Sequence, residues 1–335
     1  MPRAWYFFLF TAMAHAQTCA CTIPVFRYAL DRWEPDPLTL RIPPAQAQEP
    51  LVVDLLRPLR ANGKANLTLK TVADPLLQDA ELRDSKNSPQ ALWSGKLDAA
   101  ALGALLNSPA RQALLQRILA GESVVWVLVD GGQPGDAAEM QRIQERLKFL
   151  EQVAALPVQD PNDPDSQLGP GPALRLAFST YLVRASDPAE QLLVRMLAGP
   201  EAVGGPGRGF AAAVFGRGRV LGAWPLEKLD DAALEDACMY LVGRCSCRVK
   251  NQNPGWDLLL DVDWAAALQS AQSAGPVPTV AHAAEMPASE LETAVTLPAP
   301  VAGAGAVDRS GVPQVMILLC SAGLLLAAVV ILWKK

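Results

Sequence analysis

Two strongly apolar segments lie at opposite ends of the chain. Trp5–Ala14 is a short apolar run behind Met-Pro-Arg, and Ala14-His15-Ala16 has the small-x-small pattern of a cleavage site. This pattern predicts a secretory signal peptide over residues 1–16. The alternatives are a buried element of the mature protein and a lipoprotein anchor at Cys19 or Cys21, although the residues before both cysteines lack the aliphatic position of a lipobox.

The second segment, Val315–Trp333, contains almost no polar side chains and is followed by Lys334 and Lys335. As a helix it is about 28 Å long, enough to cross the hydrocarbon core of a bilayer. The terminal lysines favour a cytoplasmic C-terminus. The sequence therefore predicts a single-pass membrane protein with a transmembrane helix at 314–333 and an exported ectodomain, periplasmic or extracellular. A buried core helix is the alternative.

Between these ends, helical and strand-like patterns alternate, which predicts the α/β class with partly parallel strands. Helices are expected at 25–33, 49–60, 97–120 with a break near Ser108-Pro109, 136–156, 188–198 and 230–242. Strands are expected at 38–42, 66–73, 123–129, 174–184, 210–215, 219–223 and 258–262.

A Pro-, Asp- and Gly-rich segment at 158–172 is the best linker candidate in this region. It predicts two α/β lobes, at 17–157 and 173–268, with a thioredoxin-like arrangement as one candidate for the first. Residues 269–313 are rich in Ala and Pro and bury too little apolar surface to fold alone. They are predicted to form a flexible stalk before the membrane helix.

Composition excludes several function classes. The net charge is −5 with mixed signs and no basic stripe, so nucleic acid is not an expected partner. The two histidines, His15 and His282, lie in the predicted signal peptide and stalk. The predicted lobes therefore lack the histidine that Ser-His-Asp catalysis, Cys-His catalysis and the H-E-x-x-H zinc motif require.

Five cysteines belong to the predicted ectodomain: Cys19, Cys21, Cys238, Cys245 and Cys247. Because exported thiols meet an oxidising compartment, disulfide bonds are the first interpretation, with one cysteine left over. A bridge from the N-terminal pair to Cys245 or Cys247 would join the two ends of the ectodomain. The alternatives are a copper or zinc site built from the C-x-C pairs, and a redox-active dithiol. No other cofactor is expected.

Glycines mark two further candidates. Asp130–Asp136 connects a strand to a helix, but it matches no phosphate-binding motif and its aspartates repel phosphate, so an ordinary turn is favoured over a phosphate site. Phe215-Gly-Arg-Gly-Arg219 is either a hairpin tip with solvated arginines or a pair of guanidinium groups for an anion.

The segment 245–255 is dense in cysteines, polar residues and turn formers, which indicates an ordered loop. The loop is either a disulfide-pinned structural element or a binding surface. The candidates for such a surface, including the hairpin arginines, are Arg217, Arg219, Lys250, Asn251, Asn253 and Trp256.

Three strings, 26–33 (FRYALDRW), 215–219 (FGRGR) and 245–255 (CSCRVKNQNPG), resemble a family of exported, membrane-anchored bacterial proteins of unassigned activity. The resemblance implies that the three segments belong together, and it carries over no catalytic residue. The leading hypothesis is a membrane-tethered interaction or accessory protein without catalysis, whose partner is another exported or membrane protein. The alternative is a cell-surface protein that handles thiols or soft metals.

Overall fold

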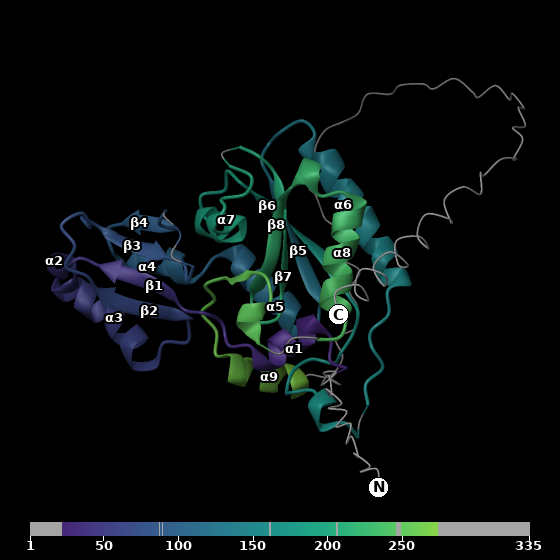
Figure 1. Ribbon diagram of the computed structural model, residues 1–335. Helices are drawn as coiled ribbons and strands as arrows, with labels where there is room; N and C mark the ends of the chain where they lie inside the picture. Colours follow the sequence, from purple (N-terminus) through teal and green to yellow (C-terminus); the bar gives the residue numbers. More distant parts are fainter. Residues whose placement is uncertain are drawn as a thin grey trace, which may run out of the picture. The chain divides into compact units, whose positions relative to one another are not determined.

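The structure is a computed structural model that describes residues 22–273, apart from 87, 89, 161, 206 and 246–248. It contains two β-sheets with helices packed against them, so the predicted mixed α/β class is confirmed (Figure 1). The predicted signal peptide and transmembrane helix lie outside the described residues. None of the helices in the described part combines the length and hydropathy of a membrane span.

The smaller sheet has four strands in the order β2-β1-β3-β4, with β1 and β2 parallel and the other pairs antiparallel. Alternation places Leu38, Leu40 and Ile42 on the buried face of β1. Its elements are β1 (Leu38–Ile42), α2 (Pro44–Ala47), α3 (Pro50–Asn62), β2 (Leu67–Thr71), β3 (Ala80–Arg83), β4 (Trp93–Gly95) and α4 (Ala99–Leu106).

The larger sheet has five strands in the order β6-β5-β7-β8-β9. Its strands are β5 (Val124–Asp130), β6 (Phe178–Arg184), β7 (Phe210–Phe215), β8 (Arg219–Pro225) and β9 (Trp256–Asp257). The apolar run in β5 is buried on both faces, as predicted, and the predicted hairpin of β7 and β8 is confirmed.

Helices cover both faces of the larger sheet. One layer contains α1 (Val25–Arg32), α6 (Asp136–Val153) and α8 (Asp231–Val242), and the other contains α5 (Pro109–Leu119), α7 (Gln191–Ala198) and α9 (Trp264–Ser273). The predicted break at Ser108-Pro109 is confirmed, because Ser108 is the N-cap of α5 and Pro109 its first residue. The predicted stalk begins too early, since residues 269–273 belong to α9.

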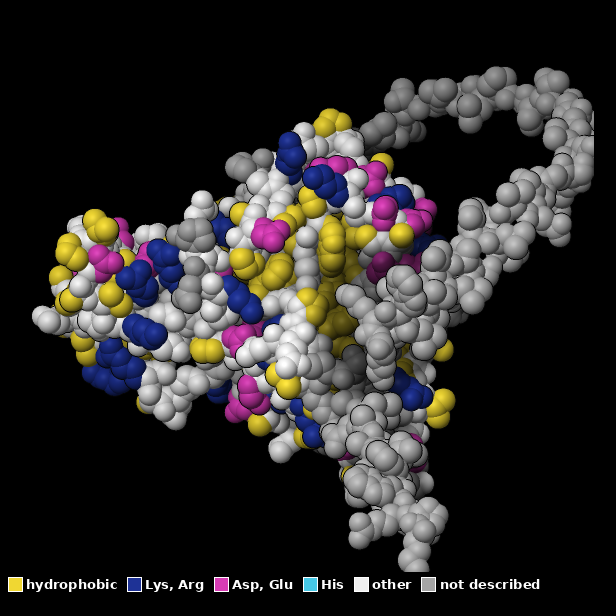
Figure 2. Space-filling model, in the orientation of Figure 1, with side chains coloured by type: hydrophobic (Ala, Val, Ile, Leu, Met, Phe, Trp, Pro, Cys, Tyr) yellow, Lys and Arg dark blue, Asp and Glu magenta, His cyan; other side chains and the backbone are white. Residues whose placement is uncertain are grey.

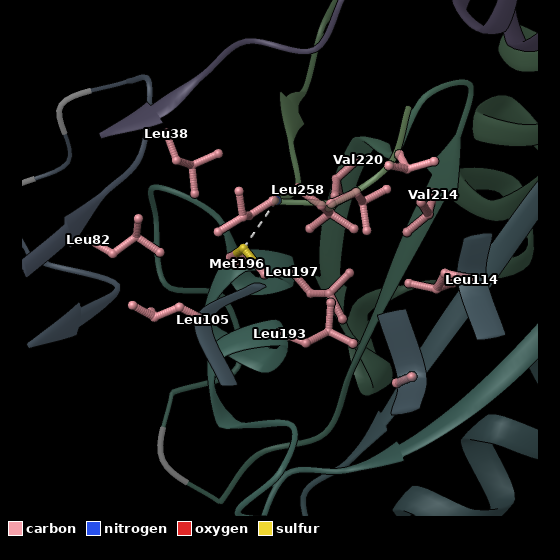
Figure 3. Packing of buried hydrophobic residues seen from close by; sticks show 14 of the residues in the cluster. Leu38, Leu82, Leu105, Leu114, Leu193, Met196, Leu197, Val214, Val220 and Leu258 are labelled. Carbon is pink, nitrogen blue, oxygen red and sulfur yellow. Dashed lines mark hydrogen bonds between the residues drawn. The ribbon is translucent and has the colours of Figure 1, made fainter. Parts of the chain in front are cut away.

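One hydrophobic core joins the two sheets. Figure 3 shows Leu38 and Leu82 of the smaller sheet on the same cluster as Met196 and Leu197 of α7, which packs on the larger sheet. Moreover, β5 precedes segment 158–172, yet it pairs with β6 and β7, which follow that segment. The two sheets therefore divide between β4 and β5, and segment 158–172 does not separate them.

Segment 158–172 packs on α1 through a buried ion pair. Arg27 Nε lies 2.9 Å from Asp31 Oδ1, and both side chains are at most 3% exposed. Arg27 donates to the carbonyl oxygens of Gly169 and Pro172, and Asp31 accepts from Gly169 N at 2.8 Å. Burial raises the pKa of Asp31, and Arg27 opposes that shift.

The apolar run at 258–262 was predicted to be a strand, and this prediction is wrong. Its apolar residues are buried, but side chains satisfy much of its backbone. Asn66 bonds Leu258 O and Leu260 N, and Met196 Sδ accepts from Leu259 N at 3.4 Å (Figure 3). The strand of this region, β9, lies just before it. The apolar pattern therefore predicted correctly that this segment lies in the core, but it did not predict which groups bond its backbone.

The close packing between β8 and the residue before β9 can be tested at Gly255. Its φ is 109°, and a Cβ there would lie 2.1 Å from the carbonyl oxygen of Val220. We expect Gly255→Ala to lower the free energy of unfolding of the full chain in detergent micelles by roughly 2–5 kcal/mol, because strained φ and overpacking add. The control is Gly132→Ala, where φ is 80° but the space is open; it should cost only about 1–2 kcal/mol. Equal losses in urea titrations would contradict the close packing.

Candidate functional site

The three strings noted in the sequence meet at one junction, formed by α1, the β7–β8 hairpin and the segment 249–257. Pro24 forms an isolated antiparallel bridge with Arg244, and Cys245 N donates to Ile23 O at 3.0 Å. The start of α1 is thereby joined to the residues that follow α8.

Arg217 connects the hairpin to the C-terminal end of α1. Its guanidinium donates to Leu30 O at 2.8 Å and Asp31 O at 3.2 Å, and it pairs with Glu34. These carbonyls belong to the last turn of α1, where a cation also complements the helix dipole. The expectation of a solvated arginine at this hairpin tip is therefore wrong, because the side chain turns back onto the helix.

Arg219 is almost fully enclosed in the junction. Its side chain and that of Asp257 are each 3% exposed, and the closest N–O distance between them is 3.3 Å. The guanidinium also donates to the carbonyl oxygens of Asn253, Pro254 and Gly255 and lies 5.7 Å from the centre of the Trp33 ring. One side chain thus links α1, β8 and the 253–257 segment, and it is not available to an external anion.

Lys250 closes the same network from the other side. Its ammonium group donates to Asp257 and to Glu34 O and lies 2.8 Å from Asp36 Oδ1, while Asp36 N donates to Asp257 Oδ2 at 2.7 Å. Burial acts to raise the pKa of Asp36, but the hydrogen bond and charge of Lys250, with the charge of Arg219, outweigh it and lower the pKa.

The remaining binding-surface candidates lie beside this network. Trp256 donates to Met196 O at 2.7 Å, and its ring lies against Gly199. Asn253 accepts from Tyr240 OH at 2.7 Å and donates to Val249 O. Asn251 is exposed on the short turn 250–252. Apart from Asn251, these side chains organise the protein itself.

Of the candidate cysteines, the structure describes Cys238 and Cys245, both buried. Cys238 carries a free thiol on α8, and burial raises its pKa to about 12, which suppresses the reactive thiolate. Cys19, Cys21 and Cys247 lie outside the described residues. Within the described ranges no three His, Cys, Asp or Glu side chains are grouped as a metal site would require.

The glycine-rich turn at 130–136 forms an ordinary connection between β5 and α6. Asp136 Oδ2 accepts from Gly131 N at 2.8 Å and Gln133 N at 3.2 Å. The carboxylate thus occupies the amide donors that a phosphate would need, and the predicted turn is confirmed.

Sequence reasoning missed Asp36 and the ion pair of Arg27 and Asp31, although all three organise the junction or its surroundings. Asp36 follows Pro35 in an extended connection, and nothing in the local pattern marks it as a partner of Lys250. The available signal was the dense run of charged and aromatic residues in the first string, which an exposed helix face also shows.

Comparison with protein-family models, curated proteins and solved structures finds no match for this chain.

The lowered pKa of Asp36 predicts an acid-sensitive junction. A depressed native-state pKa adds stability above the unfolded-state pKa, about 4, and this contribution is lost as the pH falls below that value. We expect Asp36→Asn to be less stable than wild type at pH 7, with the difference shrinking below about pH 4. Urea titrations across this range measure it. Asp54→Asn, on an exposed ion pair of α3, is the control; a pH-independent loss in Asp36→Asn would contradict the assignment.

Proposed function

We propose that this chain is an exported, membrane-tethered interaction protein without catalysis of its own. One observation carries the proposal: except for Asn251, the candidate polar and aromatic side chains described at the junction are engaged by contacts within the chain. Such a network favours a rigid scaffold, which suits a protein that presents a surface to a partner. The resemblance to exported, membrane-anchored bacterial proteins is part of the same proposal.

The membrane tether is proposed from the sequence. The apolar segment at 314–333 with its terminal lysines would anchor the ectodomain, and residues 1–16 would direct export. The partner would then be another exported or membrane protein, because these are the molecules that such an ectodomain meets.

A thioredoxin-like arrangement of the smaller sheet is also proposed. The order β2-β1-β3-β4, with β1 and β2 parallel and a helix after β1 and after β4, supports it. However, Pro43 precedes α2 and Pro44 is its first residue, at the place where a thioredoxin-like redox motif has its cysteines. This favours a scaffold over a dithiol enzyme.

The proposed disulfide would join the N-terminal cysteines to the 245–247 pair. Its support is the hydrogen bond between Cys245 N and Ile23 O, because Cys21 is two residues before Ile23 and Cys247 two residues after Cys245. The same hydrogen bond supports the second candidate function, copper or zinc handling by the C-x-C pairs, since a shared metal site would also need the two pairs to lie close together. Whether these cysteines form a disulfide bond or bind a metal ion therefore distinguishes the two functions.

The tether gives the first test. Deleting residues 315–335 should release the protein into the soluble exported fraction, because the apolar segment provides the proposed anchorage. Carbonate extraction of membranes, followed by immunoblotting, measures the release. Deleting the Ala-, Gly- and Val-rich stretch 300–313 is the control and should leave the protein in the membrane. Continued membrane retention of the first variant would contradict the single-anchor proposal.

The cysteines give the second test. Peptide mapping of the full chain under non-reducing conditions should find a cross-link between a peptide with Cys19 or Cys21 and a peptide with Cys245 or Cys247. Cys238→Ser should leave this cross-link intact, since Cys238 is buried elsewhere in α8. Reduced thiols with stoichiometric copper or zinc would contradict the bridge and favour the metal function.

A further inference from the structure

The larger sheet ends in two edges that differ in how their backbone is satisfied. At the β6 edge, Phe178 N donates to Glu151 Oε2 at 2.7 Å, and Thr180 O accepts from Arg117 at 3.1 Å. Charged side chains thus occupy outward backbone groups, a common protection of sheet edges against pairing.

The β8 edge is different because β9 is short. β9 pairs with Arg219 and Val220 alone, so among the described residues no strand covers the outer side of β8 from Leu221 to Pro225. The register fixes which groups point outward: Leu226 N donates to Gly209 O, and Ala211 lies opposite Trp224. Alternation along an antiparallel pair then directs the N–H and C=O of Ala223 away from β7.

Two walls flank this edge. The turn that follows α7 runs beside β8, because Gly199 contacts Trp256 near one end of the strand and Gly204 contacts Phe210, opposite Pro225. On the other face α8 begins soon after β8 ends, and Tyr240 near its C-terminus reaches Asn253 beside Arg219.

The walls and the strand present half-buried apolar side chains. Figure 2 shows hydrophobic side chains gathered in a strip between the region of β8 and α8. Trp224 lies on the face of the sheet that α1, α6 and α8 cover, with its ring centre 5.7 Å from that of Trp126, whereas Trp256 and Val203 pack on the opposite face. An added strand would therefore meet apolar surface with alternate side chains on both faces.

Each wall of the edge carries an exposed acidic side chain. Glu201 in the turn after α7 and Asp236 on α8 are exposed, one on each wall. Glu227, just after β8, is also exposed, with Lys228 beside it. The charge of Glu201 and Asp236 favours a ligand with basic residues around its apolar centre.

We propose that the edge of β8 at residues 221–225 binds an extended segment of another polypeptide, apolar at its centre and flanked by lysine or arginine, as an added β-strand. This inference rests on the proposed interaction function and identifies the surface that carries it. Backbone hydrogen bonds to Ala223 would supply pairing, and the tryptophans of the two faces would contact the alternating side chains.

The test uses the full chain in detergent micelles and a fluorescent peptide of alternating valine and threonine with two lysines at each end. Anisotropy should show binding to wild type. Ala223→Pro removes an outward N–H, which an edge strand tolerates, and should weaken binding about tenfold or more. The matched control is Leu182→Pro, whose N–H points outward on the β6 edge by the register with β5; it should bind like wild type.

Asp236→Lys should weaken binding of this peptide, and a version with glutamate flanks should bind wild type less tightly. No binding to wild type, or equal binding by Ala223→Pro, would overturn the inference. So would concentration-dependent dimerisation that Ala223→Pro abolishes, because it would assign the edge to a second copy. A tethered protein that fails to bind the peptide refutes strand addition alone, whereas failure of the truncation test refutes the tether.

Discussion

The ion pair of Arg219 and Asp257 is the interaction on which the arrangement of the junction depends. Both side chains are almost fully buried, and a buried charge without a partner is costly. Arg219 also donates to the carbonyl oxygens of Asn253, Pro254 and Gly255, so its guanidinium group fixes a segment that has little regular structure of its own. The position of β9 beside β8 follows from these contacts.

The free edge of β8 is a consequence of the same constraint. Because Arg219 holds the 253–257 segment against the start of β8, the chain joins β8 only at Val220 and then runs antiparallel past Arg219, away from residues 221–225. Lys250 fixes the short turn at 250–252, because its ammonium group donates to Asp257 and to Glu34 O. Among the described residues, the network that satisfies the buried charges thus also leaves the second half of β8 without a neighbouring strand on its outer side.

The sequence was informative where one local pattern determined the structure. The apolar run of β5, the glycine-bounded hairpin and the Ser108-Pro109 helix break were predicted because burial, turn geometry and capping act over a few residues. β3 and β4 were missed, since Ala80–Arg83 has polar residues among its apolar ones and β4 has only three residues. The sheet division between β4 and β5 also escaped prediction, because strand partners are chosen by tertiary packing.

The candidate site was only partly predictable for the same reason. The three strings did meet, but their charged side chains turned inward to α1 and the 253–257 segment instead of outward to a ligand. Sequence spacing cannot report this direction, because an arginine in a hairpin has the same local pattern whether it caps a helix or contacts solvent. The open edge of β8 was invisible too, since it depends on the length of its neighbour β9.

A double-mutant cycle on Arg219 and Asp257 tests the central claim most directly. In the full chain, Arg219→Met and Asp257→Asn should each lower the free energy of unfolding. The former should cost about 3–5 kcal/mol, because it removes one of the two cations paired with the buried Asp257 and leaves the carbonyl oxygens of residues 253–255 without their donor. The double variant should lose clearly less than the sum, with a coupling of about 1–3 kcal/mol. Losses that add within about 0.5 kcal/mol would show that the two side chains act independently, and would contradict the account.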